Sequence, residues 1–253
     1  MMNGLSVINA EFCRHIPNDG MNVDPPMAKL NNVNTTSIRD AVELGCRCMH
    51  RIFNADDGHT PFFLSFALPE AKLGYCGSLS DCHVPGRHLN ALLRAEELFG
   101  IEVADRAIEN HAKTLWRSFS GPVALPLSRP RIGDAPSHFL PHNCRETLWA
   151  LHALARWRQS ERAVETAERF IGAILDHWSP KSGWAKHRIE ALGLSFEDEP
   201  NPHSPNFVWS LGRALGPLVA LHQSLGMESA LELAHVVARK LIEDAFPEDG
   251  AFA

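Results

Sequence analysis

Three pairs of helical segments, each pair joined by only a few residues, restrict the possible folds of this sequence more than any other feature. The first pair is "GRHLNALLRAEELFG" with "EVADRAIENHAKTLWRSF", broken by Gly100. The second is "NCRETLWALHALARWRQ" with "SERAVETAERFIGAILDHW", and the third is "NFVWSLGRALGPLVALHQSLG" with "MESALELAHVVARKLIEDAF". A connection this short forces consecutive helices to be antiparallel neighbours. The chain is therefore predicted to contain three antiparallel helical hairpins.

A further helix is predicted before the pairs, in "SIRDAVELGCRCMHRIF", where Ser37 or Thr36 can cap the N-terminus. Its apolar residues recur with the period of an amphipathic helix: Ile38, Val42, Cys46, Met49 and Phe53. Residues 1–36 are rich in Asn, Pro and Met, and they are predicted to form an irregular N-terminal arm. Pro217 lies inside the first helix of the third pair and predicts a kink or a break there. The one plausible short strand is "PFFLSFAL".

The pairs repeat along the chain, since Leu89, Leu148 and Leu215 occupy similar places in their first helices, with a period of roughly 60 residues. A hairpin cannot bury its apolar face alone, so the units must stack or close on each other. Short and long connections must lie at opposite ends of the hairpins, which brings the long loops together and leaves room there for a substrate. These long loops are residues 54–84, 120–142 and 179–205.

Each second helix is followed by a polar, glycine-containing turn: "FNADDGHTPFF", "SFSGPVALP", "WSPKSGWAKH" and "FPEDGAFA". With "GRHLNALLRAEELFG", and with "RETLWALHALARW" followed by "ERAVETAERF", this pattern over residues 37–253 resembles the α/α-toroid, or six-hairpin glycosidase, superfamily. In that superfamily inner and outer helices alternate around a ring, and long loops at one end build the active site. The resemblance implies an all-α domain of helical hairpin repeats. Related toroids include polysaccharide lyases, sugar epimerases and terpenoid cyclases, and the fold does not choose among them.

The last turn, "FPEDGAFA", would lead into a further hairpin, so residues 37–253 are expected to form an incomplete (α/α)6 toroid, truncated at the C-terminus. The helices at the two open ends, near 37–53 and 228–246, are then expected to expose apolar side chains and to promote self-association. In the second helix these side chains are Leu231, Leu233, Ala234, Val236, Val237, Leu241 and Ile242.

Two carboxylates across a cleft are what glycoside hydrolysis needs, one as an acid and one as a base or nucleophile. Asp81 and Glu146 are the predicted catalytic pair, because both lie on the loop side near the start of a helix. Each also has a structural interpretation. Asp81 can cap its helix, and Glu146 can interact favourably with the helix dipole. Asp56 and Asp57 precede Gly58, which is common turn chemistry.

The predicted substrate-binding residues are His83, Arg87, His142, Trp184 and His203. His83 and Arg87 are four residues apart and share a helix face, where they could bind a carboxylate or a sugar hydroxyl or simply support local structure. Trp184 offers an aromatic face for a sugar, although it could equally anchor its loop. His138, His142 and Cys144 suggest zinc, but their spacing is incomplete for a site, so neither a metal nor another cofactor is expected.

The overall composition restricts the partners. The net charge is −6 and no basic block stands out, which argues against a nucleic-acid surface. There is no apolar run of about 18 residues, so no membrane span is expected, and the first twenty residues do not resemble a secretory signal. Six cysteines without a CxxC pair favour reduced thiols and a cytoplasmic location.

The leading functional hypothesis is a carbohydrate-active protein of the six-hairpin glycosidase type that hydrolyses glycosides with two carboxylates. One alternative is a polysaccharide lyase or a sugar epimerase of the same fold. In the epimerase, paired histidines would move protons. Another is a non-catalytic helical-repeat scaffold that binds a partner in its concave face. The expected ligand is a carbohydrate or a uronic-acid-containing substrate.

Overall fold

The computed structural model describes residues 37–66, 72–197 and 206–245, and these are mostly helical, as predicted. The expected N-terminal arm lies outside the described residues. The longer helices are α1 (Ile38–Met49), α2 (His83–Phe99), α3 (Asp105–Ser118), α4 (Cys144–Arg158), α5 (Glu161–His177), α8 (Leu215–Leu225) and α9 (Glu228–Ala245). Two short helices are α6 (Lys186–Glu190) and α7 (Asn206–Trp209).

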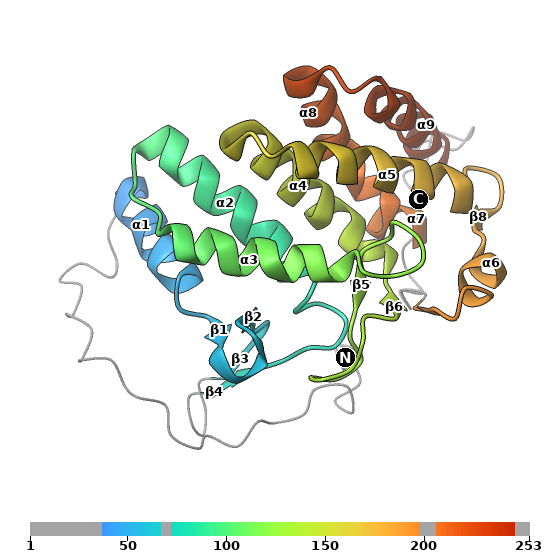
Figure 1. Ribbon diagram of the computed structural model, residues 1–253. Coiled ribbons are helices and arrows are strands. Elements are labelled where there is room, and N and C mark those ends of the chain that lie inside the picture. The colour runs from blue at the N-terminus through green and yellow to red at the C-terminus, as the bar shows by residue number, and fades with distance from the viewer. Residues whose placement is uncertain (1–36, 67–71, 198–205, 246–253) are drawn as a thin grey trace, which may run out of the picture.

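The three predicted hairpins are present as α2–α3, α4–α5 and α8–α9, and the two helices of each pair pack against each other (Figure 1). Their connections turn through residues with left-handed backbone conformations. Gly100 and Gly226 end α2 and α8 with φ values of 59° and 67°. Glycine has no Cβ to clash in this conformation, which makes it the common residue after a helix. Ser37 caps α1 by accepting a hydrogen bond from the backbone N–H of Asp40, as expected.

The first helix of the third pair is interrupted, as Pro217 predicted, but the interruption precedes the proline. The segment forms α7, then a 3-10 turn η4 (Leu211–Ala214), and then α8. Pro217 sits in the first turn of α8, where a backbone N–H would have no partner within the helix. The irregular backbone at Ser210, with φ −102° and ψ −105°, marks the break.

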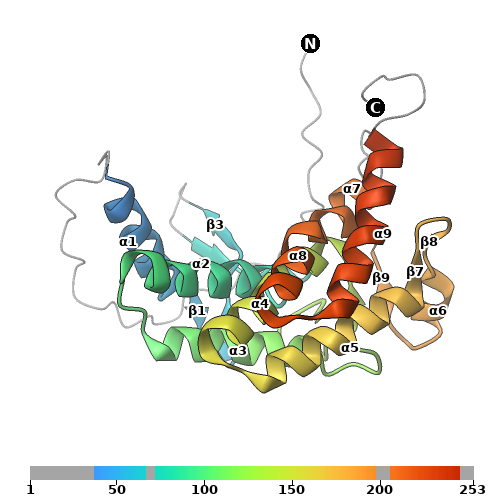
Figure 2. The same ribbon diagram turned by 90° about the horizontal axis from the view of Figure 1, so that it is seen from above.

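The first helices of the pairs form one layer and the second helices flank it (Figure 2). Helix α2 packs on α4, α4 packs on α8, and α5 packs on α9. Leu89 and Leu148, which repeat along the sequence, are fully buried between these helices. Whether such layers belong to a toroid stays a prediction.

The described parts of the three long loops contact one another, as expected. They contain short strands: β1 (Phe53–Asn54), β2 (Thr60–Pro61), β3 (Leu64–Phe66), β4 (Lys72–Gly74), β5 (Leu127–Ser128), β6 (His138–Phe139), β7 (Trp178–Ser179), β8 (Gly183–Trp184) and β9 (Ser195–Phe196). Strand β6 of the second loop pairs with β5 and, in parallel, with β9 of the third loop. Ser78 of the first loop donates a hydrogen bond to Glu197 of the third at 3.0 Å.

The expectation that α9 exposes an apolar face is largely wrong. Leu233, Ala234 and Val237 are buried, because α9 packs on α8, α5 and η4. Ile242 is 59% exposed, and at the other end of the described chain Ile38 is 73% exposed. Within the described residues, no helix combines the length and the apolar character that crossing a membrane requires.

Gly86 sets the distance between α2 and α4. A Cβ atom at this position would collide with the backbone carbonyl group of Glu146 and would lie 2.7 Å from the Cβ atom of that residue. Contacts this short with a backbone do not occur, so only glycine permits the two helices to approach as they do. The same close approach brings the start of α4 beside the start of α2.

The substitution Gly86→Ala is therefore expected to lower the free energy of unfolding by about 1–3 kcal/mol, the cost of overpacking. Gly172→Ala is the matched control, since Gly172 lies inside α5 and an added methyl group there would meet no neighbour within 4 Å. The free energy of unfolding of that control is expected to rise by about 0.5–1 kcal/mol, because alanine loses less backbone entropy on folding than glycine does. Urea denaturation measures both. Equal stabilities of the two variants would contradict the tight packing at Gly86.

Candidate functional site

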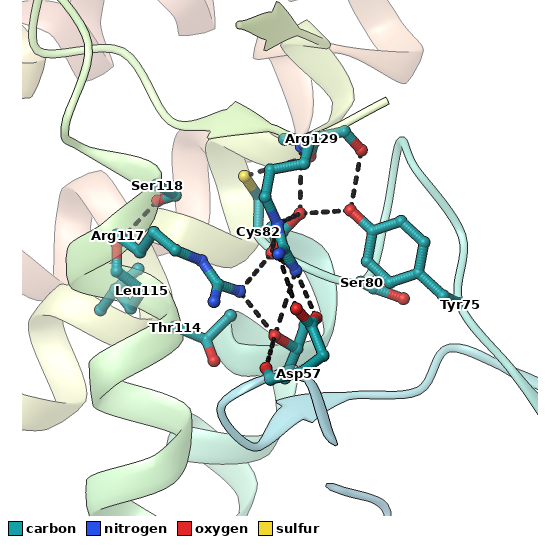
Figure 3. A network of polar contacts seen from close by, with 12 residues as sticks. Asp57, Tyr75, Ser80, Cys82, Thr114, Leu115, Arg117, Ser118 and Arg129 are labelled. Atoms are coloured by element: carbon teal, nitrogen blue, oxygen red, sulfur yellow. Dashed lines mark hydrogen bonds and ion pairs between the residues drawn. The ribbon is translucent and has the colours of Figure 1, made fainter. Parts of the chain in front are cut away.

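Asp81 belongs to a buried ion network that holds two of the long loops together, and its partners Tyr75, Arg117 and Arg129 are labelled in Figure 3. One carboxylate oxygen accepts hydrogen bonds from the Tyr75 hydroxyl at 2.6 Å and from the backbone N–H of Arg129 at 3.0 Å. The other accepts from Arg117 at 2.7 Å and from Arg129 Nε at 3.2 Å. The residues of this Arg129 network are Asp57, Thr60, Tyr75, Asp81, Arg117 and Arg129.

Arg129 bridges two carboxylates. Its terminal nitrogens donate to both oxygens of Asp57, at 2.9 and 2.6 Å, while its Nε atom faces Asp81. Such a two-pronged pair is the strongest arrangement that a guanidinium makes with a carboxylate. Burial alone would raise the pKa of Asp57, but hydrogen bonds from Arg129 and Thr60 outweigh it and lower the pKa. Burial and the neighbouring Asp81 raise the pKa of Tyr75, so the hydroxyl keeps its proton and donates it.

This network assigns Asp81 a structural role in place of the predicted catalytic one. Both of its oxygens are held by cations and a hydroxyl, and none is left to exchange a proton with a substrate. The capping interpretation is also wrong, because no side chain caps the start of α2. Asp57 does lie in the turn that its sequence context predicted, before Gly58 with φ 58°. Its partner Arg129 was not predicted.

Glu146 is the centre of a second cluster, on the first turn of α4. Its side chain is 1% exposed, and Oε1 receives contacts from three arginines. Arg145 donates from Nε at 2.9 Å, Arg213 donates at 2.8 Å, and Arg87 Nε lies at 3.6 Å. The arginines come from α2, α4 and η4, so the cluster joins all three hairpins. The residues of this Glu146 cluster are His83, Arg87, His142, Arg145, Glu146 and Arg213.

Two imidazoles lie beside Glu146. The rings of His83 and His142 stack with centroids 5.2 Å apart and an interplanar angle of 17°. His83 Nδ1 is 3.8 Å from Glu146 Oε1, and His142 Nδ1 accepts a hydrogen bond from Arg213 at 2.6 Å. Burial lowers the pKa of His83 to about 3, against the attraction of Glu146, so its ring is neutral at neutral pH.

Burial would raise the pKa of Glu146, but the positive charges of Arg213 and Arg145 and the hydrogen bond from Arg145 lower it. Glu146 is therefore ionised at neutral pH. Its second oxygen, Oε2, is buried without a hydrogen-bond partner in the described structure, and so is His83 Nδ1. Unpartnered buried polar atoms are costly, so these two atoms are candidates for contact with a ligand.

The side-chain donors of His83, His142 and Glu146 lie within 4.8 Å of one another, close enough to hold a metal ion. The surrounding charge opposes a cation. Among the described residues, Arg87 and Arg145 have Glu146 as their only carboxylate partner. Two guanidinium groups beside one carboxylate repel a divalent ion and attract an anion. The chemistry of this cluster therefore fits an acidic ligand better than a metal.

Four of the predicted site residues thus come together: His83, Arg87, His142 and Glu146. Trp184 lies elsewhere, partly buried, with its ring 5.0 Å from Phe139, which supports its anchoring interpretation. His203 lies outside the described residues. His138, considered as a zinc ligand, instead bonds Ser195 and Glu197 at 2.7 and 2.6 Å and joins two loops.

Sequence reasoning missed the contribution of Arg145 and Arg213. Arg213 lies in "WSLGRALGP", an apolar stretch next to the helix break. A single charge inside an apolar segment is unusual unless it is paired, and this was the available signal. Arg145 directly precedes Glu146. Helix periodicity predicts contacts between residues three or four apart, so it could not predict this contact between neighbouring residues.

An apolar cavity of about 270 Å³ adjoins the Glu146 cluster. It is lined by residues of α1, the β3–β4 hairpin and α2, and it shares His83 and Arg87 with the cluster. The Phe63 ring stands edge-on to His83, with centroids 5.9 Å apart.

No protein-family model matches this chain, and no curated protein or solved structure matches it either. The resemblance to the toroid superfamily therefore stays a prediction, and the function must be argued from the site.

The Arg129 network predicts a large effect on stability. Arg129→Met would leave Asp57 and Asp81 buried with one cation fewer, and it is expected to lower the free energy of unfolding by about 3–5 kcal/mol. Arg131→Met is the control, because its ion pair with Asp134 is exposed and should contribute less than about 1 kcal/mol. Chemical denaturation compares the two variants. A loss for Arg129→Met as small as that of the control would contradict the network's structural role.

Buried histidines predict a pH dependence of stability. Burial, with Arg87 nearby, lowers the pKa of His88 to about 4 from an ordinary value of 6.5. In the unfolded chain His88 is protonated below about pH 6.5, whereas in the folded chain it is protonated only below about pH 4. The free energy of unfolding therefore falls as the pH drops through this window. One such group contributes at most about 1.4 kcal/mol per pH unit.

His88→Gln is expected to reduce this pH dependence by up to one proton between pH 6.5 and pH 4. Urea denaturation at several pH values measures the slope, with the exposed His235→Gln as a control for the substitution itself. A slope that His88→Gln leaves unchanged would show that His88 is protonated in the folded chain.

Proposed function

We propose that this chain is a carbohydrate-active protein that acts on a uronic-acid-containing substrate by proton transfer, in the manner of a polysaccharide lyase or a sugar epimerase. The observation that carries the proposal is the Glu146 cluster, in which arginines and two stacked imidazoles surround one buried carboxylate. The toroid resemblance supports the same class of substrate, and it is independent of this geometry.

Proton removal next to a carboxylate needs two kinds of group. Cations must neutralise the substrate carboxylate and stabilise the charge that develops on it, which is a large contribution in a site of low polarity. Arg87 is the arginine best placed for this, because its side chain is 55% exposed and reaches the cluster. A base must also accept the proton, and a neutral imidazole is the most common one.

His83 supplies that base in our proposal. Its Nδ1 atom has no hydrogen-bond partner in the described structure and can accept a proton. Burial lowers its pKa to about 3, but a bound anion would favour the protonated ring and raise this pKa. His142 stacks on His83 and contacts Arg213, so it helps to orient the His83 ring.

The reaction balances without a co-reactant. The C–H bond beside the carboxylate breaks, the proton goes to His83, and the electron pair moves into the carboxylate. In elimination, the C–O bond to the leaving sugar then breaks and that oxygen takes a proton. In epimerisation, a proton returns to the same carbon from the opposite face.

Hydrolysis by two carboxylates fits the geometry less well. Glu146 would need a second free carboxylate, and Asp81 is held in the Arg129 network. Glu197 is bound by His138 and Ser78. The Glu146 cluster, as far as the structure describes it, contains one carboxylate.

The test measures removal of the proton from the carbon beside the carboxylate. The protein is incubated in D₂O with polygalacturonate and with glucuronate, and deuterium at the carbon beside the carboxylate is measured by NMR. The ultraviolet absorbance of an unsaturated product distinguishes elimination from epimerisation. His83→Gln is expected to slow deuterium incorporation and formation of the unsaturated product at least about 100-fold, the usual contribution of a general base.

His138→Gln is the matched control, since this loop histidine bonds Ser195 and Glu197 and lies outside the Glu146 cluster. It is expected to retain activity. Release of reducing sugar with neither deuterium incorporation nor an unsaturated product would indicate hydrolysis and would overturn the proposal, as would full activity of His83→Gln.

A further inference from the structure

The cavity beside the Glu146 cluster is apolar over most of its surface. It lies between α1, the β3–β4 hairpin and the first turns of α2. Its apolar lining includes Met49, Ile52, Phe62, Phe63, Leu73 and Val84. A sugar hydroxyl placed against these side chains would lose its hydrogen bonds to water without replacement, which is costly. The walls therefore favour a hydrocarbon group over a sugar ring.

One end of the cavity is lined by polar side chains that are either cationic or neutral. His83, Arg87 and His88 line the cavity, and among the described residues no carboxylate does. The Nδ1 atoms of His83 and His88 are buried without a hydrogen-bond partner. The Nε atom of Arg87 faces Glu146, while its two terminal nitrogens have no hydrogen bond within the described structure. This end of the cavity is therefore complementary to an anion.

The size of the cavity restricts the apolar group. A dry cavity of about 150 Å³ holds a benzene molecule, and pockets for drug-sized ligands begin near about 300 Å³. A volume of about 270 Å³ thus accommodates one six-membered ring with a short linker. It is too small for a chain of several sugars.

We propose that this cavity is the subsite for an apolar group, one ring in size, carried by the anionic substrate, and that Arg87 holds the substrate carboxylate between the cavity and His83. The ligand class is a uronic acid linked to an aryl or alicyclic group. The identification of this ligand as the substrate rests on the proposed function, but its binding does not require turnover.

Three probes separate the contributions of the ring and of the carboxylate to the binding affinity. Phenyl glucosiduronate carries the ring and the carboxylate, phenyl glucoside lacks the carboxylate, and methyl glucosiduronate lacks the ring. Isothermal titration calorimetry measures the affinity of the protein for each probe. Phenyl glucosiduronate is expected to bind at least about tenfold more tightly than either of the others, because burial of the ring and the ion pair with Arg87 each favour binding.

Two variants locate the site, and both positions are exposed enough for the chain to fold. Arg87→Gln is expected to abolish the preference for phenyl glucosiduronate over phenyl glucoside, with Arg131→Gln as its control. Leu73→Trp is expected to fill the cavity and abolish the preference over methyl glucosiduronate. Its control is Ile132→Trp, since Leu73 and Ile132 are both 38% exposed and Ile132 does not line the cavity.

The outcomes distinguish this inference from the proposed function. Tight binding of phenyl glucosiduronate that depends on Arg87 and Leu73, with neither deuterium exchange nor an unsaturated product from the uronic acids, supports the cavity and contradicts the proposed proton transfer. Deuterium exchange on uronic acids with no preference for a phenyl group overturns the cavity assignment alone. Equal affinity for the three probes, or preferences that persist in Arg87→Gln and Leu73→Trp, also overturns it.

Discussion

The buried guanidinium group of Arg129 is the interaction on which the loop side of this protein depends. It ties the loop before α4 to the loop before α2 by contacting Asp57 and Asp81 together. Burying an arginine is expensive, and the cost is met only when carboxylates and hydrogen bonds satisfy the whole group. With Arg117, the network contains two guanidinium groups and two carboxylates, so its charges balance. A charge-balanced cluster of this kind fixes backbone positions and offers little to a ligand.

The Glu146 cluster lies next to this network along the chain, since His83 follows Asp81 closely, but it is built differently. Several arginines share one carboxylate oxygen, while the other oxygen and His83 Nδ1 lack partners in the described structure. Positive charge in excess is what an anionic ligand would neutralise, and hydroxyl groups on the same ligand could donate to the unpartnered acceptors. This difference in charge balance is the reason to assign structure to one cluster and function to the other.

The packing at Gly86 links the positions of the two clusters. Because α4 passes against its Cα, Glu146 is brought within reach of His83 and Arg87. The Arg129 network fixes the start of α2 from the other side. Small shifts in either contact would change the spacing of the imidazoles and the arginines, so the geometry of the Glu146 cluster depends on the packing of the Glu146 backbone against Gly86 and on the Arg129 network.

The sequence alone determined the helices, the hairpins and the meeting of the long loops, because helix period, short connections and chain direction are local properties. It also predicted His83, Arg87, His142 and Glu146 as site residues, which stand near helix starts on the loop side, and the structure brings these four together. It could not distinguish Asp81 from Glu146, since both are acidic residues in similar positions. Only the tertiary structure showed that Asp81 is enclosed by Arg129 and Arg117 while Glu146 faces a group of arginines. Ion pairing joins residues far apart in the chain, so the role of a carboxylate is decided by which cations the fold brings to it.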